Sequence, residues 1–306
     1  MHDTFLGLSP ERKAQSKSVC TLETVVEGYG PISAGKRRGN MHCFAKRAIV
    51  LLLLTTLPGT AWGGWLDELY SARTIVTGQG EKNRETGFRD CLDHVLVRVS
   101  GDQRLPHRPE MKAMRTRAGS FVRSFSYHDR LAGRPIHDEQ GTYDRPHDLT
   151  CRYDPMVVDE LLAGLGSRPW RDARPSRAVF LDVRRGRPSY RVSPDAPRDA
   201  AMRESFALSA EPMAMQISFP SSTDVDAWAL GPGAPELARA AKAAGADLAL
   251  VGKLIWSDAD LGWTGTWRLA EGKKEHVWTV RGVNFDEAFR VAVRGAAQIL
   301  SGNGSP

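Results

Sequence analysis

An uncharged apolar segment near the N-terminus, residues 48–57, decides which part of this 306-residue chain takes part in folding. Two basic residues precede it and a Pro-Gly pair at 58–59 ends it. Ala61-Trp62-Gly63 follows, with a small residue in its first and third places. This order is typical of a secretory signal peptide. The segment is shorter than the ~20 apolar residues that cross a bilayer, and an uncleaved anchor is the alternative. We therefore expect residues 41–63 to be a signal peptide, cut after Gly63, with Ala61 and Gly63 forming the cleavage site.

The forty residues before Met41 are polar, and Met41 stands where a signal peptide would begin. We expect residues 1–40 to be a mis-annotated or disordered extension and Met41 to be the true start. A genuine cytoplasmic extension is the alternative. Detection of a native peptide from residues 1–40 by mass spectrometry would contradict the expectation.

Charge gives little reason to expect nucleic acid or an acidic membrane as a partner. The first 63 residues hold eight of the 42 Lys and Arg and four of the 36 Asp and Glu, so most of the formal charge of +6 leaves with them. The part that remains is long enough for one large or two small domains. Its formal charge is only about +2, too small to attract a polyanion. No stable membrane span is expected after cleavage.

Two of the four cysteines, Cys91 and Cys151, lie beyond the cleavage site. Cys91 lies on the apolar face of a helix predicted over 84–99, and Cys151 shares the apolar side of a predicted strand with Leu149 and Tyr153. Both thiols therefore point toward one core, in a compartment that permits disulfides. The pattern is compatible with a disulfide and with two buried free thiols.

Periodicity predicts an α+β fold of two small α/β sandwich-like domains, each a mixed sheet covered by helices. We expect an N-terminal domain over 65–166, a polar linker over 167–177, a C-terminal domain over 178–301 and a disordered tail over 302–306. The first domain is predicted to contain strands at 72–77, 121–127 and 149–153 and helices at 84–99, 110–118 and 155–165. The second is predicted to contain strands at 178–183, near 190, 214–219, 247–256, 263–269 and 277–283 and helices at 198–208, 235–244 and 285–300.

Motifs for catalysis or cofactors are absent from the sequence: it has no G-x-S-x-G, H-E-x-x-H, P-loop or C-x-x-C. We expect no cofactor. Asp224 and Asp226 are weak candidates for a divalent cation, because their spacing resembles half of such a site. The alternative is turn chemistry between strands.

Tryptophans crowd the last predicted hairpin, with Trp263 and Trp267 on one side of a strand and Trp278 on the next strand. A flat aromatic face is a possible contact surface for a partner protein or for sugar rings. The alternative is that these rings form sheet core beneath the predicted helix over 285–300.

Five further segments form a recurring set: Leu92–Gly101 (LDHVLVRVSG), Arg152-Tyr153-Asp154-Pro155, Pro169-Trp170, Gly245–Leu254 (GADLALVGKL) and Trp263-x-x-x-Trp267. Together they resemble an exported bacterial family, the domain-of-unknown-function family 2066 (DUF2066). The resemblance spans about 69–300, although 184–213 departs from it, and it implies an envelope protein without an established activity. The second domain is also loosely similar to α/β modules of the Tol-system propeller protein, the flagellar H-ring and curli secretion, which serve in assembly and docking.

We therefore expect a periplasmic protein that is not an enzyme and that docks an envelope protein partner or supports envelope assembly. The alternative is a hydrolase or glycan-binding protein that uses the acidic loop at Asp224 and Asp226 and the tryptophan-rich sheet face. A deep cleft with convergent acids and a shifted carboxylate pKa would favour this alternative, and a flat, pocket-poor surface with covered tryptophans would favour docking.

Overall fold

A computed structural model describes residues 61–133, 145–221 and 225–306, which belong to one compact unit spanning Gly59–Pro306. The predicted extension, nearly all of the predicted signal peptide, and Asp224 lie outside the described residues. Helices combine with one antiparallel and one mixed sheet, so the prediction of an α+β fold is confirmed. None of the helices in the described ranges has the length and apolar character needed to cross a membrane.

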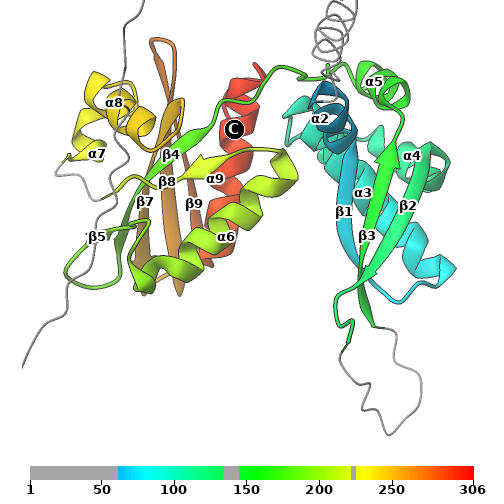
Figure 1. The fold of residues 1–306 in the computed structure, drawn as a ribbon, viewed down its shortest axis with the longest axis horizontal. Coiled ribbons are helices and arrows are strands. Elements are labelled where there is room, and N and C mark those ends of the chain that lie inside the picture. The colour runs from blue at the N-terminus through cyan, green and yellow to red at the C-terminus, as the bar shows by residue number, and fades with distance from the viewer. Residues whose placement is uncertain (1–60, 134–144, 222–224) are drawn as a thin grey trace, which may run out of the picture. The chain divides into compact units, whose positions relative to one another are not determined.

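The first sheet has three strands in the order β1-β3-β2 (Figure 1). Helix α3 packs on β1 and β3 and covers one face. The sheet is antiparallel throughout, because the central strand β3 runs opposite to both neighbours, so the prediction of a mixed sheet is wrong for this part. The elements of this part are α2 (Ala61–Leu69), β1 (Ser71–Thr77), α3 (Glu81–Ser100), α4 (Met111–Thr116), β2 (Val122–Asp129), β3 (Pro146–Tyr153) and α5 (Pro155–Gly164), with 3-10 turns at Leu105–His107 and Ala118–Phe121.

A disulfide joins Cys91 of α3 to Cys151 of β3. Both residues are fully buried, and their Cα atoms lie 6.3 Å apart. Cys91 lies on the helix face that packs on the sheet, and Cys151 pairs with Ala72 of β1 and Phe125 of β2. Of the two alternatives that the sequence leaves open, the structure contains the disulfide.

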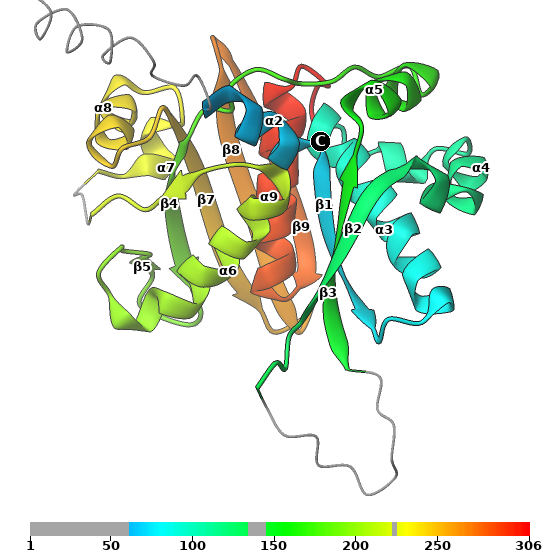
Figure 2. The same ribbon diagram turned by 45° about the vertical axis from the view of Figure 1, so that its right-hand side comes forward.

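The second sheet follows the order β5-β4-β7-β8-β9, with β6 also paired to β4 (Figure 2). It is mixed, as predicted: β4 runs parallel to β6 and β7, and the other pairs are antiparallel. Its strands are β4 (Arg177–Arg184), β5 (Tyr190–Arg191), β6 (Ile217–Ser218), β7 (Leu248–Ser257), β8 (Gly262–Glu271) and β9 (Lys274–Val283). The predicted strand over 214–219 shortens to β6, because 211–213 form a 3-10 turn and Ala214 adopts a positive φ of 50°.

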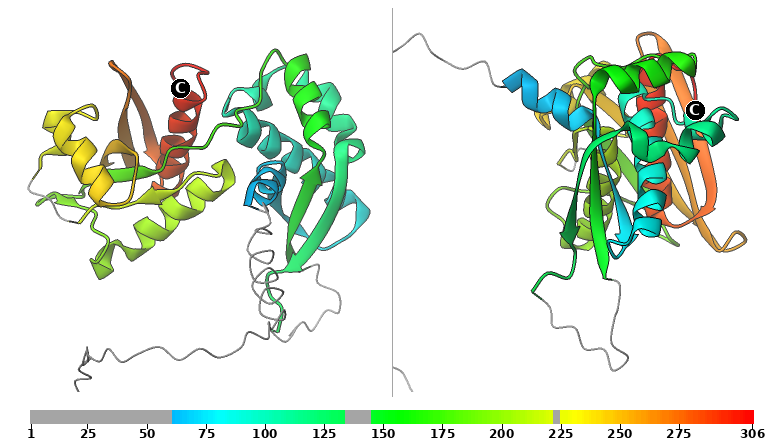
Figure 3. Two further views of the ribbon diagram at one scale, coloured as in Figure 1. Left: turned by 45° about the horizontal axis from the view of Figure 1, so that its top comes forward. Right: turned by 90° about the vertical axis from the view of Figure 1, so that its right-hand side faces the viewer.

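Helices cover both faces of this sheet. On one face, α6 (Ala200–Ala210) packs beside α9 (Phe285–Leu300), and α9 lies along β8 and β9 (Figure 3). On the other face, α7 (Ala227–Leu230) and α8 (Pro235–Ala243) pack on β4 and β7. A 3-10 turn at Pro197–Asp199 precedes α6. Strand β7 is therefore buried on both faces, which explains its continuous apolar pattern.

The tryptophans of the hairpin belong to the core beneath α9 and α6. Trp267 is fully buried and Trp263 and Trp278 are each 7% exposed, so the prediction of a contact surface at these three residues is wrong. Glycines make room for two of the rings, because a Cβ on Gly252 would overlap Trp267 and one on Gly295 would overlap Trp278. The predicted alternative, sheet core under the last helix, is what the structure shows.

Candidate functional site

A cavity of about 520 Å³ opens on the α8 side of the second sheet, where the parallel strands β4 and β7 end. The volume falls in the range of roughly 300–1,000 Å³ that is usual for sites of small ligands. Ligands of sheets with parallel strands bind preferentially beyond the carboxyl ends of those strands. The charged lining residues are Asp182 and Arg184 of β4, Arg191 of β5, Lys253 of β7, and Asp226 before α7.

Strand alternation directs these side chains to the cavity. Leu181 and Val183 of β4 belong to the core beneath α6 and α9, so Asp182 and Arg184 face the opposite side. Leu254 of β7 belongs to the same core. Its neighbours Lys253 and Ile255 therefore line the cavity, and the two strands together present a mixed charged and apolar wall.

Both carboxylates of the cavity already accept hydrogen bonds from the fold. An oxygen of Asp182 accepts the Nε–H of Arg191 at 2.8 Å. The Oδ1 atom of Asp226 accepts the backbone N–H of Ala229 at 3.0 Å and so caps the N-terminus of α7. Asp226 therefore has a structural role as a helix cap, whereas the sequence offered turn chemistry between strands as the alternative to a metal site. In the described ranges, no group of three or more His, Cys, Asp or Glu side chains is arranged to hold a metal ion.

One cation of the cavity, Lys253, is positioned by an aromatic ring. The Nζ atom of Lys253 lies 4.3 Å from the centre of the Trp228 ring in α7, a cation–π contact. The Arg268 guanidinium lies 5.0 Å from the same ring and donates to the Trp228 carbonyl. Asp226 therefore caps the helix that carries Trp228, and the Trp228 ring contacts Lys253.

A basic loop continues the charge of the cavity outward. It joins the lining residues Arg184 and Ser189, and it also exposes Arg185 and Arg187. The Arg185 guanidinium lies 4.8 Å from the centre of the Trp256 ring, which packs against the core beneath α6 and α9, so Arg185 lies on the face opposite the cavity. No sequence motif assigned a role to these residues, although the run Arg-Arg-Gly-Arg at 184–187 indicates a basic loop.

The predicted cleavage residues Ala61 and Gly63 lie at the start of α2. Beyond them, Trp65 packs against the first core, and Leu69 and Tyr70 are buried in it. The fold therefore starts to bury side chains just after the predicted cleavage site. Cleavage itself stays a prediction.

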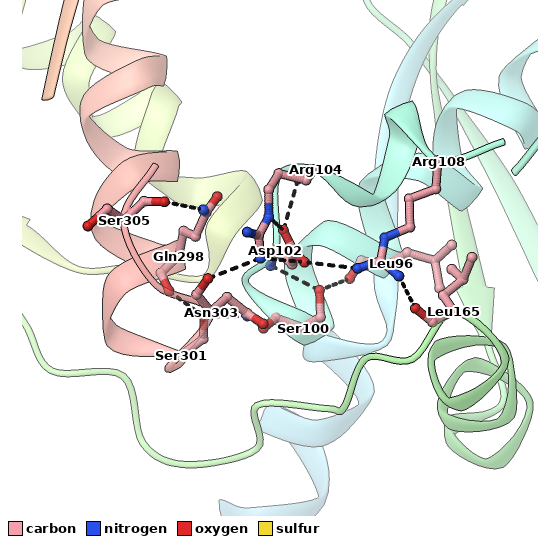
Figure 4. A network of polar contacts seen from close by, with 10 residues as sticks. All are labelled: Leu96, Ser100, Asp102, Arg104, Arg108, Leu165, Gln298, Ser301, Asn303 and Ser305. Atoms are coloured by element: carbon pink, nitrogen blue, oxygen red, sulfur yellow. Dashed lines mark hydrogen bonds and ion pairs between the residues drawn. The ribbon is translucent and has the colours of Figure 1, made fainter. Parts of the chain in front are cut away.

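A polar network around Asp102 holds the C-terminal residues in place (Figure 4). Asp102 is 1% exposed and accepts hydrogen bonds from the Arg104 side chain at 2.8 Å and its backbone N–H at 3.0 Å. Asn303 donates to the Ser100 carbonyl at 2.9 Å, and its own carbonyl accepts from Arg104 at 3.0 Å. Gln298 donates to the Ser305 carbonyl at 2.8 Å. The prediction of a disordered tail over 302–306 is therefore wrong, because these long-range bonds fix it.

The charges in this network lower the pKa of Asp102. Burial by itself raises the pKa of the carboxyl, but the hydrogen bonds from Arg104 and the charges of Arg104 and Arg108 outweigh it. Asp102 is therefore held as a carboxylate that joins the end of α3 to the C-terminus.

The predicted linker is anchored at several points. The Trp170 backbone donates to the Val99 carbonyl at 2.8 Å, and the Trp170 ring lies in the core of the second sheet. Arg174 donates to the Met213 and Arg98 carbonyls. Burial, together with the charges of Arg98 and Arg177, lowers the pKa of Arg174 to about 9. These contacts tie the segment to elements on both of its sides.

Comparison with known proteins adds one finding. Residues 66–171 match a family described as a domain of unknown function, DUF8605. The matched segment contains the first sheet and its helices. No curated protein and no solved structure matches the chain. The match covers less than half of the chain and carries no activity. The resemblance to DUF2066 stays a prediction.

Proposed function

We propose that this chain is an exported periplasmic protein that is not an enzyme and that docks a protein partner in the cell envelope. The resemblance of the sequence to DUF2066 and to envelope docking modules supports this function. Its contact site is the cavity at the ends of β4 and β7 together with the basic loop 184–187.

Two features support export. The N-terminal order of charge, apolar run and small residues is that of a signal peptide. The disulfide between Cys91 and Cys151 is of a kind that persists in oxidising compartments and is rare in the cytosol.

The observation that carries the docking proposal is that both carboxylates of the cavity accept structural hydrogen bonds while Lys253 and Arg184 add positive charge. General acid–base catalysis needs a side chain that can exchange a proton with a substrate within hydrogen-bond reach. Asp182 and Asp226 instead accept hydrogen bonds that hold β5 and α7. Lys253 and Arg184 add positive charge to the wall, an arrangement suited to binding. The glycan-binding alternative also needed an open tryptophan face, and Trp263, Trp267 and Trp278 are covered.

Export is tested by fractionating cells and sequencing the N-terminus of the purified protein. We expect a periplasmic protein that begins at Gly64. A cytoplasmic protein that retains residues 41–63 would contradict the proposal.

Docking is tested by placing a photo-crosslinking residue at Ser189, which is exposed and lines the cavity. A matched control places it at Met156 of α5, which is 80% exposed and lies on the first sheet's part of the fold. We expect a discrete adduct with one envelope protein from Ser189 only, and its loss in an Arg184→Glu variant. Equal adducts from both positions would count against docking at this site.

A further inference from the structure

We propose that the cavity recognises an acidic peptide segment of the partner, with one carboxylate at Lys253 and Arg184 and a further carboxylate at Arg187. This inference rests on the proposed function and adds the chemistry of the partner. It concerns residues to which neither the sequence motifs nor the matching family assigns a role.

The balance of charge in the cavity favours an anion. Three cations and two carboxylates line it. Asp182 is paired with Arg191, so these two charges largely cancel. Asp226 caps α7 through Oδ1 and keeps its negative charge, so the charged lining residues sum to +1. Lys253 and Arg184 remain to attract a ligand, and Coulomb attraction in a partly enclosed site is stronger than in bulk water.

The position of Lys253 is set before a ligand binds. Its ammonium is held over the Trp228 ring, and the ring is held by α7 and by Arg268. A pre-positioned side chain loses less conformational freedom when it binds.

The shape of the charged surface favours a peptide over a small anion. Positive charge at the cavity is continued by the exposed Arg187, three residues beyond Arg184, which is farther than one carboxylate can span. Val225 and Ile255 add apolar contacts between the charges. A segment that alternates acidic and apolar residues would satisfy both, and its charges would also speed association with the basic surface.

The binding test uses the peptide Ac-Glu-Leu-Asp-Glu-NH₂ and its neutral counterpart Ac-Gln-Leu-Asn-Gln-NH₂, measured by calorimetry or NMR titration on the mature protein. We expect the acidic peptide to bind and to weaken as salt rises. Binding should fall about tenfold in Lys253→Gln, a change typical of losing a hydrogen-bonded charge, and about threefold in Arg187→Gln at the exposed rim. Lys253→Arg should retain most of the affinity.

Controls separate this site from general electrostatics. Lys112→Gln on α4 removes an equal charge from another exposed position and should leave the affinity unchanged. Melting temperatures within a degree or two of the parent, measured for every variant, exclude unfolding as the cause of lost binding. Titration with inorganic phosphate separates peptide recognition from capture of a free anion.

Three results would overturn the inference: equal binding of the neutral peptide, equal losses in Lys112→Gln and Lys253→Gln, or phosphate binding as tightly as the acidic peptide. If the peptide fails while crosslinking from Ser189 still captures a partner, the docking function stands and the acidic chemistry falls. If both fail, the proposed function falls too.

Discussion

At the scale of single residues, glycines decide where the tryptophans go. Trp267 lies directly opposite Gly252 in the register of β7 and β8, and its ring occupies the space that a side chain on residue 252 would need. Trp278 uses Gly295 of α9 in the same way. The absence of a Cβ at these positions turns a row of large aromatic residues into a closed core.

Replacement of Gly252 by alanine should therefore destabilise the fold. The new methyl group would force the fully buried Trp267 ring to move, at a cost of about 1–3 kcal/mol in the free energy of unfolding. Denaturant unfolding followed by tryptophan fluorescence measures it. Gly164→Ala at the end of α5 is the control, because no atom lies within 4 Å of its Cβ position. Equal effects of the two changes would contradict the explanation.

Asp102 should contribute stability that depends on pH. Its pKa is lowered in the folded state, so its contribution is present above the unfolded value of about 3.9 and is lost as pH falls through the lower folded value. We expect Asp102→Asn to lower the free energy of unfolding by about 2 kcal/mol at pH 7, since a buried charge-assisted bond is lost. The difference from the parent should shrink below about pH 4. Asp90→Asn, at an exposed position of α3, should show neither effect.

At the scale of elements, the four-residue helix α7 connects the acidic loop to the cavity. It is too short to be stable by itself, and it depends on the cap from Asp226 and on contacts of Trp228 with Lys253 and Arg268. The element therefore depends on the tertiary structure, which explains why the periodicity of the sequence did not predict it.

Two substitutions of Asp226 distinguish its structural role as a helix cap from a chemical role of its charge. Asn caps helices as well as Asp does, whereas Ala does not, at a cost of about 1 kcal/mol. We expect Asp226→Asn to retain slow amide hydrogen exchange in α7 and full binding of the acidic peptide. Asp226→Ala should speed exchange over 227–230 and weaken the peptide. Loss of function in Asp226→Asn would instead indicate a role for the charge, as in a hydrolase or metal site.

The disulfide joins a helix to the centre of a sheet and closes a loop with a sequence separation of 60 residues. By the loop-entropy relation, its removal should lower the free energy of unfolding by about 4 kcal/mol. We expect this loss in the parent protein after reduction and in the double variant Cys91→Ala/Cys151→Ala, which should not respond to reductant. Alkylation of both thiols in unreduced, unfolded protein would show that the bond does not form.

At the scale of the whole molecule, the C-terminal residues link distant elements through hydrogen bonds. Asn303 donates to the carbonyl of Ser100, the last residue of α3, and Ser305 bonds to His276 of β9 and to Gln298 of α9. Gln298 is fully buried and His276 is 2% exposed, so both would lose partners that water cannot readily replace.

Deletion of residues 302–306 should therefore lower the free energy of unfolding by about 1–3 kcal/mol, since buried polar groups lose their partners. Thermal and denaturant unfolding measure the change. Deletion of Pro306 alone removes none of these bonds and should have no effect. An unchanged stability after the longer deletion would show that the tail contributes nothing.

Much of the secondary structure follows from local pattern. Helix α9 begins and ends at the predicted residues, α5 begins at the predicted residue 155, and β8 and β9 form the predicted hairpin. Each depends on a periodic apolar face or on a capping or turn residue close by in the sequence. The sequence alone also placed Cys91 and Cys151 on facing apolar sides, which is where the disulfide forms.

The features that the sequence analysis missed depend on residues far apart in the chain. The cavity combines β4, β5, β7 and the segment before α7, and the fixed tail needs partners about 30 and 200 residues away. Burial of the tryptophans required the glycines of two other elements to lie against them. The sequence by itself determined most of the elements, the apolar positions of the two thiols and the fold class, because short-range sterics and periodicity act within a few residues. Tertiary structure alone decided which charges line the cavity and which aromatic rings are covered, because contacts between distant segments create both.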